Sequence, residues 1–102
     1  MKEVIVINRL SIKPGKMDEF IEAQRTFAAG MRMTPNALVG GRMYRSVDGT
    51  SAVLVSIFAS TRAQDEVRQL PAFKEHLARL QPMIESSSPG LYEEAYTTGT
   101  FQ

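Results

Sequence analysis

A chain of 102 residues, 43% hydrophobic and 23% charged, has the size and composition of one soluble globular domain, and we expect residues 1–102 to form it. Twelve basic and eleven acidic side chains leave a formal charge of +1, so no net field draws the chain to nucleic acid or to an anionic membrane. The absence of cysteine excludes disulfides, thiolate metal sites and a cysteine nucleophile. A single histidine excludes any site that needs two imidazoles from one chain.

The first residues show no targeting segment. Four apolar residues, 4–7, are followed at once by Asn8 and Arg9. A signal peptide needs an apolar stretch of about 7–15 residues, and a membrane helix needs about 20. We therefore expect a cytoplasmic protein.

Residues 3–12 predict a strand with apolar side chains on both faces, because Val4, Val6, Asn8, Leu10 and Ile12 alternate with Ile5 and Ile7. The turn residues 13–15 should end it. A helix follows, whose apolar residues recur with a 3.6-residue period and whose end is signalled by Gly30 and residues 34–36. The residues of this apolar stripe are Met17, Phe20, Ile21, Phe27, Ala28 and Met31.

Two strands, at about 37–46 and 51–59, are predicted to form a hairpin, because Asp48-Gly49 between apolar runs is a strong hairpin signal. With a three-residue loop and Gly49 in the left-handed region, even positions would lie opposite even positions. Tyr44 and Phe58 would then share one face of the sheet.

A second helical region should begin at Ser60 or Thr61, since Thr61 and Gln64 fit the spacing of a capping box. Pro71 should break or kink it. The expected buried stripe beyond the break comprises Phe73, Leu77, Leu80 and Ile84. Residues 86–90, a Ser-Ser-Ser-Pro-Gly run, are predicted to be a loop, and residues 91–98 a last strand.

This order, β-α-β-β-α-β, predicts a ferredoxin-like α+β fold with a four-stranded antiparallel sheet and two helices on one face. The uncovered face would carry a contiguous apolar patch, which monomers rarely expose. A two-fold homodimer with its sheets face to face would bury that patch. Its residues are Ile5, Ile7, Val53, Val55 and Ile57.

Asn8 and His76 are the polar candidates for a functional site. Asn8 shares a strand face with apolar residues, so its amide is either a structural group bonded to a neighbouring loop or a donor that orients a ligand or an oxyanion. His76 lies at the edge of a helical stripe, where it is a partly exposed surface residue, a general base or a ligand contact. No second histidine or paired carboxylate lies at ligand spacing, so we predict no metal site.

Aromatic side chains supply either the core or the walls of a flat pocket between sheet and helices. The aromatic candidates are Tyr44, Phe58 and Phe73, and they would share the pocket with Leu54 and Asn8. The element order also fits RNA-recognition domains, but residues 52–58 carry no stacking aromatic in mid-strand. We therefore expect no nucleic-acid partner and no membrane.

An ordered set of short motifs covers nearly the whole chain and resembles the antibiotic biosynthesis monooxygenase family of dimeric α+β barrels. The set consists of Asn8-Arg9-Leu10, Lys13-Pro14-Gly15, Thr34-Pro35, residues 44–50, Phe58-Ala59-Ser60 and residues 71–76. The resemblance implies a homodimer and a small aromatic ligand. Its anthrone and quinol oxygenases need no metal or flavin, because the ionised substrate itself passes an electron to O₂.

The resemblance also suggests roles. Asn8 matches a first-strand asparagine of the haem-degrading branch, Phe58 stands where tryptophan is usual, and His76 lies one residue before the position of the haem-ligating histidine. Against the anthrone oxygenases, Tyr44 takes a histidine position, while Leu54 replaces an asparagine and Gln64 a tyrosine.

We predict a cofactor-independent monooxygenase for a phenol, quinol or anthrone. Asn8 would orient the oxyanion and His76 or Tyr44 would relay protons. Phe58, Phe73 and Leu54 would line the pocket. The alternatives are a non-catalytic dimeric domain that binds a small ligand, and a domain that binds or degrades haem.

Overall fold

A computed structural model of the chain describes residues 3–31 and 38–100. The elements follow in the order β1 (Val4–Ile12), α1 (Met17–Met31), β2 (Gly40–Arg45), β3 (Ser51–Phe58), α2 (Thr61–Gln69), α3 (Pro71–Leu80), a short 3-10 helix η1 (Gln81–Met83) and β4 (Ile84–Tyr92). The helix-ending signal at residues 34–36 lies outside the described residues. Within the described ranges, no helix is both long and apolar enough to cross a membrane.

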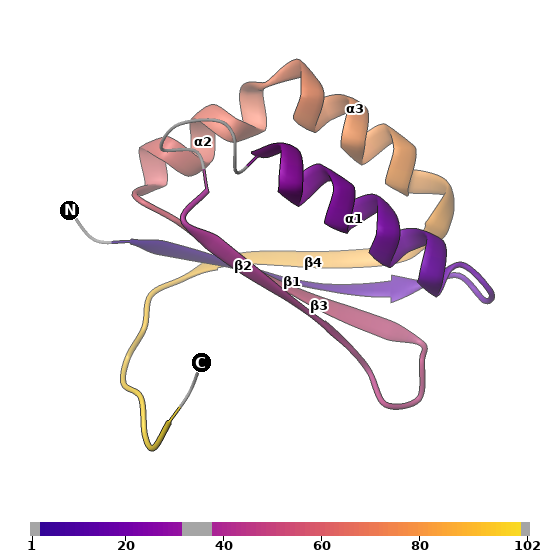
Figure 1. Cartoon of the computed structure of the whole chain (residues 1–102), viewed down its shortest axis with the longest axis horizontal. Helices are drawn as coiled ribbons and strands as arrows, with labels where there is room; N and C mark the ends of the chain where they lie inside the picture. The colour runs from indigo at the N-terminus through magenta and orange to yellow at the C-terminus, as the bar shows by residue number, and fades with distance from the viewer. Residues whose placement is uncertain (1–2, 32–37, 101–102) are drawn as a thin grey trace.

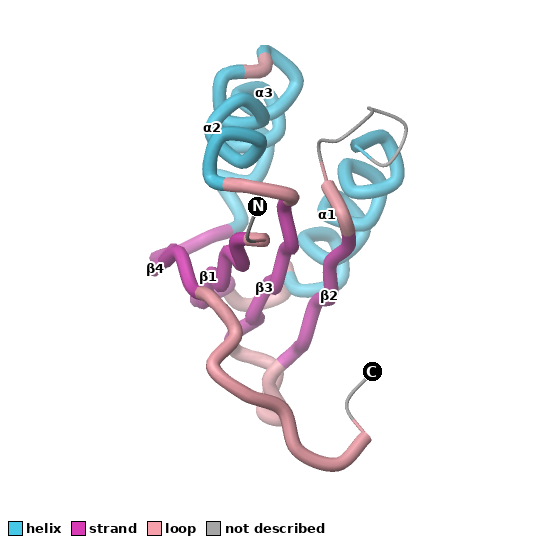
Figure 2. The backbone as a smooth tube through the Cα atoms, turned by 90° about the vertical axis from the view of Figure 1, so that its left-hand side faces the viewer, coloured by secondary structure: helices cyan, strands magenta, loops and turns pink. Residues whose placement is uncertain are grey.

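The strands form one antiparallel sheet in the order β2-β3-β1-β4, and the helices all lie on one of its faces (Figures 1 and 2). This arrangement is the predicted ferredoxin-like fold. Pro71 splits the second helical region as expected, because Leu70 takes an extended conformation before it (φ −67°, ψ 136°).

The pairing of β1 with β3 places even-numbered residues of both strands on the face that the helices cover. The opposite, open face carries the predicted apolar row, whose members are all half-buried: Ile5, Ile7, Val53, Val55 and Ile57. Figure 2 shows the segment after β4 leaving the sheet on this open side. Residues 91–100 are themselves exposed, and Tyr92 lies beside Ile5 on this face.

The core under the helices is divided into two clusters. One contains Leu10, Phe20 and Leu80, and the other contains Val4, Phe58 and Val67. Between them, the middle of the helix-covered face is incompletely filled, since Asn8 and Leu54, which face each other across β1 and β3, are only partly buried. The fold thus leaves space at the centre of the sheet rather than at its edge.

The hairpin between β2 and β3 has a different register from the one expected. Its loop contains four residues, 47–50, because the Ser46 N–H donates to the Ser51 carbonyl at 2.8 Å. Tyr44 consequently lies opposite Val53 and points to the open face, away from Phe58. The prediction that Tyr44 and Phe58 share a face is therefore wrong.

Side-chain acceptors explain the longer loop. The Ser46 hydroxyl accepts the backbone N–H groups of Thr50 and Ser51 at 3.1 and 3.0 Å, and the Asp48 carboxylate accepts the Thr50 N–H at 3.0 Å. These bonds stabilise one more loop residue than the sequence pattern suggests. Gly49 does adopt the predicted left-handed conformation, with φ +77°.

The last strand also differs from its prediction. β4 includes the Ser-Ser-Ser-Pro-Gly run at 86–90, which we expected to be a loop, and it ends at Tyr92 rather than at 98. β4 is an edge strand, where a proline without an N–H is tolerated. Asn8 supplies an additional contact, since its Oδ1 accepts the Ser88 N–H at 3.1 Å.

One member of the predicted stripe of α3 differs in the structure, where His76 is buried and Leu77 is 48% exposed. Leu80 is buried as predicted, and Ile84 packs against the core from the start of β4. Between Phe73 and Leu80, a helix can bury the residue three positions after Phe73, which is His76, or the one four positions after it, which is Leu77. Periodicity alone therefore allowed either residue to be buried. At the start of α2, Ser60 rather than Thr61 is the N-cap, and its hydroxyl accepts the Ala63 N–H at 3.1 Å.

Candidate functional site

A cavity of about 630 Å³ lies between the sheet and the helices, in the space between the two core clusters. We call it the inner cavity. Five of the six predicted site residues line it: Asn8, Leu54, Phe58, Phe73 and His76. The strands supply the first three and α3 supplies the other two, so the fold brings together residues that are far apart in the sequence.

Tyr44 does not join this group. It is 43% exposed, and its phenol oxygen accepts a hydrogen bond from Arg42 Nη1 at 3.2 Å. The longer hairpin loop is the reason, because it turns Tyr44 to the other face of the sheet. The expectation that Tyr44 shares a pocket with Asn8 is therefore wrong.

Apolar side chains form most of the cavity wall. Phe27 and Phe73 contact each other across α1 and α3, with ring centroids 5.8 Å apart and planes inclined by 55°. Phe58 closes the sheet side. A cavity of this size with a mainly apolar surface is typical of sites for small organic ligands.

His76 is the most unusual residue of the wall. Its ring is only 2% exposed and stacks on Phe27, with centroids 4.0 Å apart and an interplanar angle of 2°. Burial of the ring and, to a lesser extent, the positive charge of Arg79 lower the pKa of His76 from 6.5 to about 4. The imidazole is therefore uncharged at neutral pH.

Gln24 is a site residue that the sequence analysis missed. Its Oε1 lies 2.6 Å from His76 Nε2 and joins α1 to α3. The sequence contains a signal for it, because position 24 follows Phe20 by four residues and Ile21 by three, and so belongs to the apolar stripe of α1. A glutamine within such a stripe must find a hydrogen-bond partner in the interior.

The structure shows the structural role that was predicted as one alternative for Asn8, and it involves one end of the amide. Oδ1 accepts the Ser88 N–H, and since a backbone N–H can only donate, this contact fixes the amide orientation. No described residue accepts a hydrogen bond from Nδ2. Asn8 therefore offers two N–H donors at the wall of the inner cavity.

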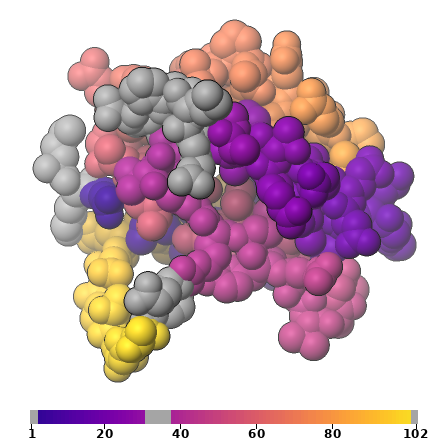
Figure 3. Space-filling model, viewed as in Figure 1, coloured from indigo at the N-terminus to yellow at the C-terminus, as the bar shows by residue number. Residues whose placement is uncertain are grey.

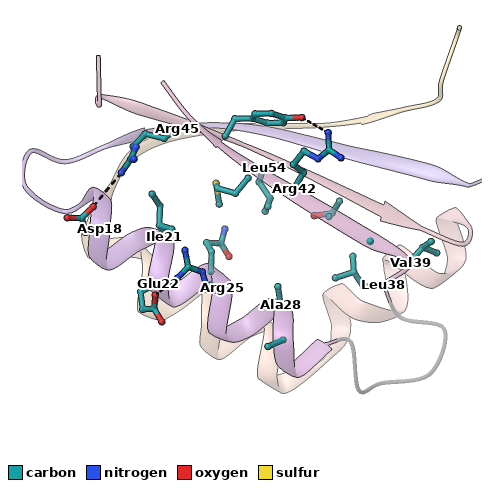
Figure 4. Close-up of a pocket in the computed structure, with 17 residues that line it drawn as sticks. Asp18, Ile21, Glu22, Arg25, Ala28, Leu38, Val39, Arg42, Arg45 and Leu54 are labelled. Carbon is teal, nitrogen blue, oxygen red and sulfur yellow. Dashed lines mark hydrogen bonds and ion pairs between the residues drawn. The ribbon is translucent and has the colours of Figure 1, made fainter. Parts of the chain in front are cut away.

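A second, larger hollow of about 1130 Å³ lies between α1 and β2, and we call it the outer groove (Figures 3 and 4). It shares part of its wall with the inner cavity, including Gln24, Ala28 and Leu54. The two spaces therefore adjoin. In Figure 4 charged side chains border the outer groove, where Arg45 pairs with Asp18 at 3.6 Å and Arg25 with Glu22 at 3.1 Å.

The site does not fit a haem. The atom that would ligate iron, His76 Nε2, is already bonded to Gln24, and Phe27 covers one face of the ring. Among the residues the structure describes, no group of three or more histidine, aspartate or glutamate side chains could hold a metal ion.

Comparisons with known proteins agree with this fold. The antibiotic biosynthesis monooxygenase family model matches residues 3–79. A search of curated proteins finds no significant match. Among solved structures, SnoaB, a cofactor-independent oxygenase from Streptomyces nogalater, is 24% identical, with a TM-score of 0.85 over 95% of this chain and 97% of that one.

Two further structures have the same fold. Rv0793 from Mycobacterium tuberculosis is 19% identical, with a TM-score of 0.81 over 96% of this chain and 100% of that one. Protein SO0527 from Shewanella oneidensis is 19% identical, with a TM-score of 0.80 over 91% of each chain.

Proposed function

Because the chain belongs to the antibiotic biosynthesis monooxygenase family, we propose that it is a cofactor-independent monooxygenase for a small phenol, quinol or anthrone. The observation that carries this proposal is the inner cavity, whose mainly apolar wall includes three phenylalanines, the Asn8 amide and an uncharged imidazole. An apolar cavity suits the ring system of the substrate, and its few polar groups can act on one oxygen and one proton.

The proposed reaction needs no electron carrier other than the substrate. Removal of a proton from an anthrone CH₂ group leaves a carbanion, which is also the phenolate of the tautomeric enol. One electron passes to O₂, and the resulting radical and superoxide combine to form a peroxide anion. Protonation and loss of water then give the ketone, so that CH₂ and O₂ become C=O and H₂O. The substrate loses four electrons and O₂ gains four.

Each polar group has one task in this sequence. The Asn8 Nδ2 donors stabilise the negative charge on the substrate oxygen, which is strongest while the carbanion exists. His76 accepts the proton and later returns it to the peroxide. An anion held beside the imidazole raises the pKa of that imidazole, so the substrate itself makes a better base of His76.

We further propose that the protein works as a homodimer with its two sheets face to face. The half-buried apolar row on the open face supports this arrangement, because all helices of the described residues lie on the other face of the sheet. The inner cavity lies on the other face, so each subunit would keep its own site.

Oxygen uptake by the purified protein with anthrone, 1-naphthol and hydroquinone tests the proposed activity. Asn8→Asp keeps an acceptor for the Ser88 N–H but removes both donors, whereas Asn8→Ala removes all of these groups. Both variants should lower kcat by about 100-fold to 1000-fold, as the loss of an oxyanion donor does elsewhere. Asn8→Asp should also keep the wild-type unfolding curve.

The outcomes separate the possible functions. Uptake that is unchanged in both variants would contradict the role of Asn8. If no substrate of the panel is oxidised, while calorimetry shows that 1-naphthol binds, the domain is a ligand-binding protein and the oxygenase proposal is wrong.

A further inference from the structure

His76 is held from α1 in two independent ways. The hydrogen bond from its Nε2 to Gln24 Oε1, 2.6 Å long, fixes the direction in which one edge of the ring points. The stacking on Phe27, with planes only 2° apart, fixes the ring plane. Gln24 and Phe27 are three residues apart on α1 and so lie on the same side of that helix.

The position of the single imidazole proton follows from the hydrogen-bond partners. An amide oxygen only accepts, so the contact with Oε1 places the proton on Nε2. The uncharged ring then carries a lone pair on Nδ1. If the Gln24 amide were turned round, its NH₂ group would face Nε2 and the proton would have to lie on Nδ1. Nδ1 has no partner among the described residues, and a buried N–H without an acceptor is costly.

The surroundings of His76 favour the uncharged ring. Besides Gln24, the α1 side chains that line the inner cavity are Phe27 and Ala28, which carry no charge. In the described part of the chain, the charged residues lining the cavity are Arg68 from α2 and Glu85 from β4, and both are exposed. Arg79, on α3 itself, disfavours a second positive charge.

We propose that Gln24 is a positioning residue that holds His76 in the tautomer with the proton on Nε2, so that Nδ1 is the atom that accepts the substrate proton. The second half of this statement rests on the proposed function. In that step the substrate O–H or C–H bond breaks, its electron pair stays on the substrate, and the Nδ1 lone pair forms the new N–H bond. The imidazolium keeps its Nε2–H bond to Gln24, which is now charge-assisted.

Nδ1 is also kept dry. It exposes almost no surface in the empty cavity, although His76 lines the cavity wall. A ligand larger than water can therefore reach the Nδ1 lone pair only if the cavity wall beside the ring moves when the ligand binds, and until then water does not compete for that lone pair.

The test is ¹⁵N NMR of the intact protein, in which the one histidine gives one pair of ring nitrogens. At pH 7 the wild type should show a protonated Nε2 and an unprotonated Nδ1. Adding 1-naphthol, a phenol that serves as the probe, should shift the Nδ1 resonance most. A protonated Nδ1 in the ligand-free wild type would overturn the proposal.

Two variants test the part played by Gln24. Gln24→Met has a similar length without an amide, so the tautomer preference should disappear and kcat should fall at least tenfold with little change in KM. Gln24→Glu places a carboxylate beside Nε2 and should raise the pKa of His76 by about 1–3 units. Gln69→Met is the matched control, because Gln69 is exposed and lies outside the inner cavity.

The two halves of the proposal fail differently. A tautomer that is unchanged in Gln24→Met would show that Gln24 does not position the ring. A tautomer that depends on Gln24, in a protein that oxidises none of the substrates, would keep the positioning role and overturn the role of Nδ1 as proton acceptor.

Discussion

Replacing His76 with phenylalanine should remove a pH dependence from the stability of the fold. The buried imidazole has a pKa of about 4 in the folded chain, against 6.5 when it is solvated. Between these values the unfolded chain binds a proton that the folded chain excludes. The free energy of unfolding must therefore decrease as the pH falls from about 6.5 to 4.

The size of the effect follows from the shift. A difference of 2.5 pKa units (6.5 − 4) at 1.36 kcal/mol per unit corresponds to about 3 kcal/mol. The contribution is fully present above pH 6.5, and below pH 4 both states are protonated and no more is lost. Only 2% of His76 is exposed, but its ring lines an open cavity, so about 3 kcal/mol is the upper end of the effect.

Urea unfolding of wild type and His76→Phe at pH 7 and pH 4.5, at one fixed protein concentration, measures this dependence. Phenylalanine keeps a ring against Phe27 but leaves Gln24 Oε1 unpaired, a cost that does not vary with pH. The wild type should therefore lose about 2–3 kcal/mol more than the variant on acidification. The remaining titratable groups are common to both proteins and cancel in the comparison.

Two results would refute the reasoning. If wild type and variant lose the same stability between pH 7 and 4.5, the folded imidazole titrates like a solvated one. An NMR titration that places the pKa of His76 at or above 6.5 would lead to the same conclusion.

Four shorter predictions concern other parts of the chain. Val55→Glu puts a charge on the open face and should convert dimer to monomer in sedimentation equilibrium; an unchanged mass would contradict the face-to-face dimer. Leu54→Trp should fill the wall that the two hollows share and abolish 1-naphthol binding in calorimetry, whereas retained affinity would show that the ligand binds elsewhere. Tyr44→Phe should leave oxygen uptake unchanged, because Tyr44 lies outside the inner cavity, and a large loss would restore it as a proton relay. Hydrogen bonds from Ser46 and then from Thr50 lower the pKa of Asp48 from 3.8 to about 2, so the stability that Asp48 adds to the hairpin is present above pH 3.8 and is lost as the pH falls through about 2. Asp48→Asn should speed hydrogen exchange of the Thr50 amide at neutral pH, and equal exchange rates would contradict this role.

Sequence periodicity predicted most of the fold because each of its strong signals acts locally. The alternation in β1 and β3, the stripe of α1 and the break at Pro71 all depend on neighbouring residues. The serines of β4 carry no such signal. They form a strand because β1 offers a partner and because Asn8 binds the Ser88 N–H, and both contacts span about 80 residues of sequence.

The sequence allowed us to predict which residues line the cavity better than how their side chains are oriented. Asn8 and His76 stood out as polar groups near apolar stripes, and both line the cavity. Periodicity allowed either of two adjacent residues of α3, His76 or Leu77, to face α1, and in the structure His76 does so and contacts Gln24. The face of Tyr44 depends on one extra loop residue, which side-chain hydrogen bonds stabilise.

The two ends of the Asn8 amide have a consequence for which amino acids position 8 can tolerate. Its oxygen binds the edge strand while its nitrogen has no partner among the described residues, so folding and the proposed turnover place different demands on the same side chain. In a library with every amino acid at this position, selection for folding alone should keep both asparagine and aspartate, whose Oδ1 can accept the Ser88 N–H. Selection for turnover should return asparagine alone, because aspartate lacks its NH₂ donor.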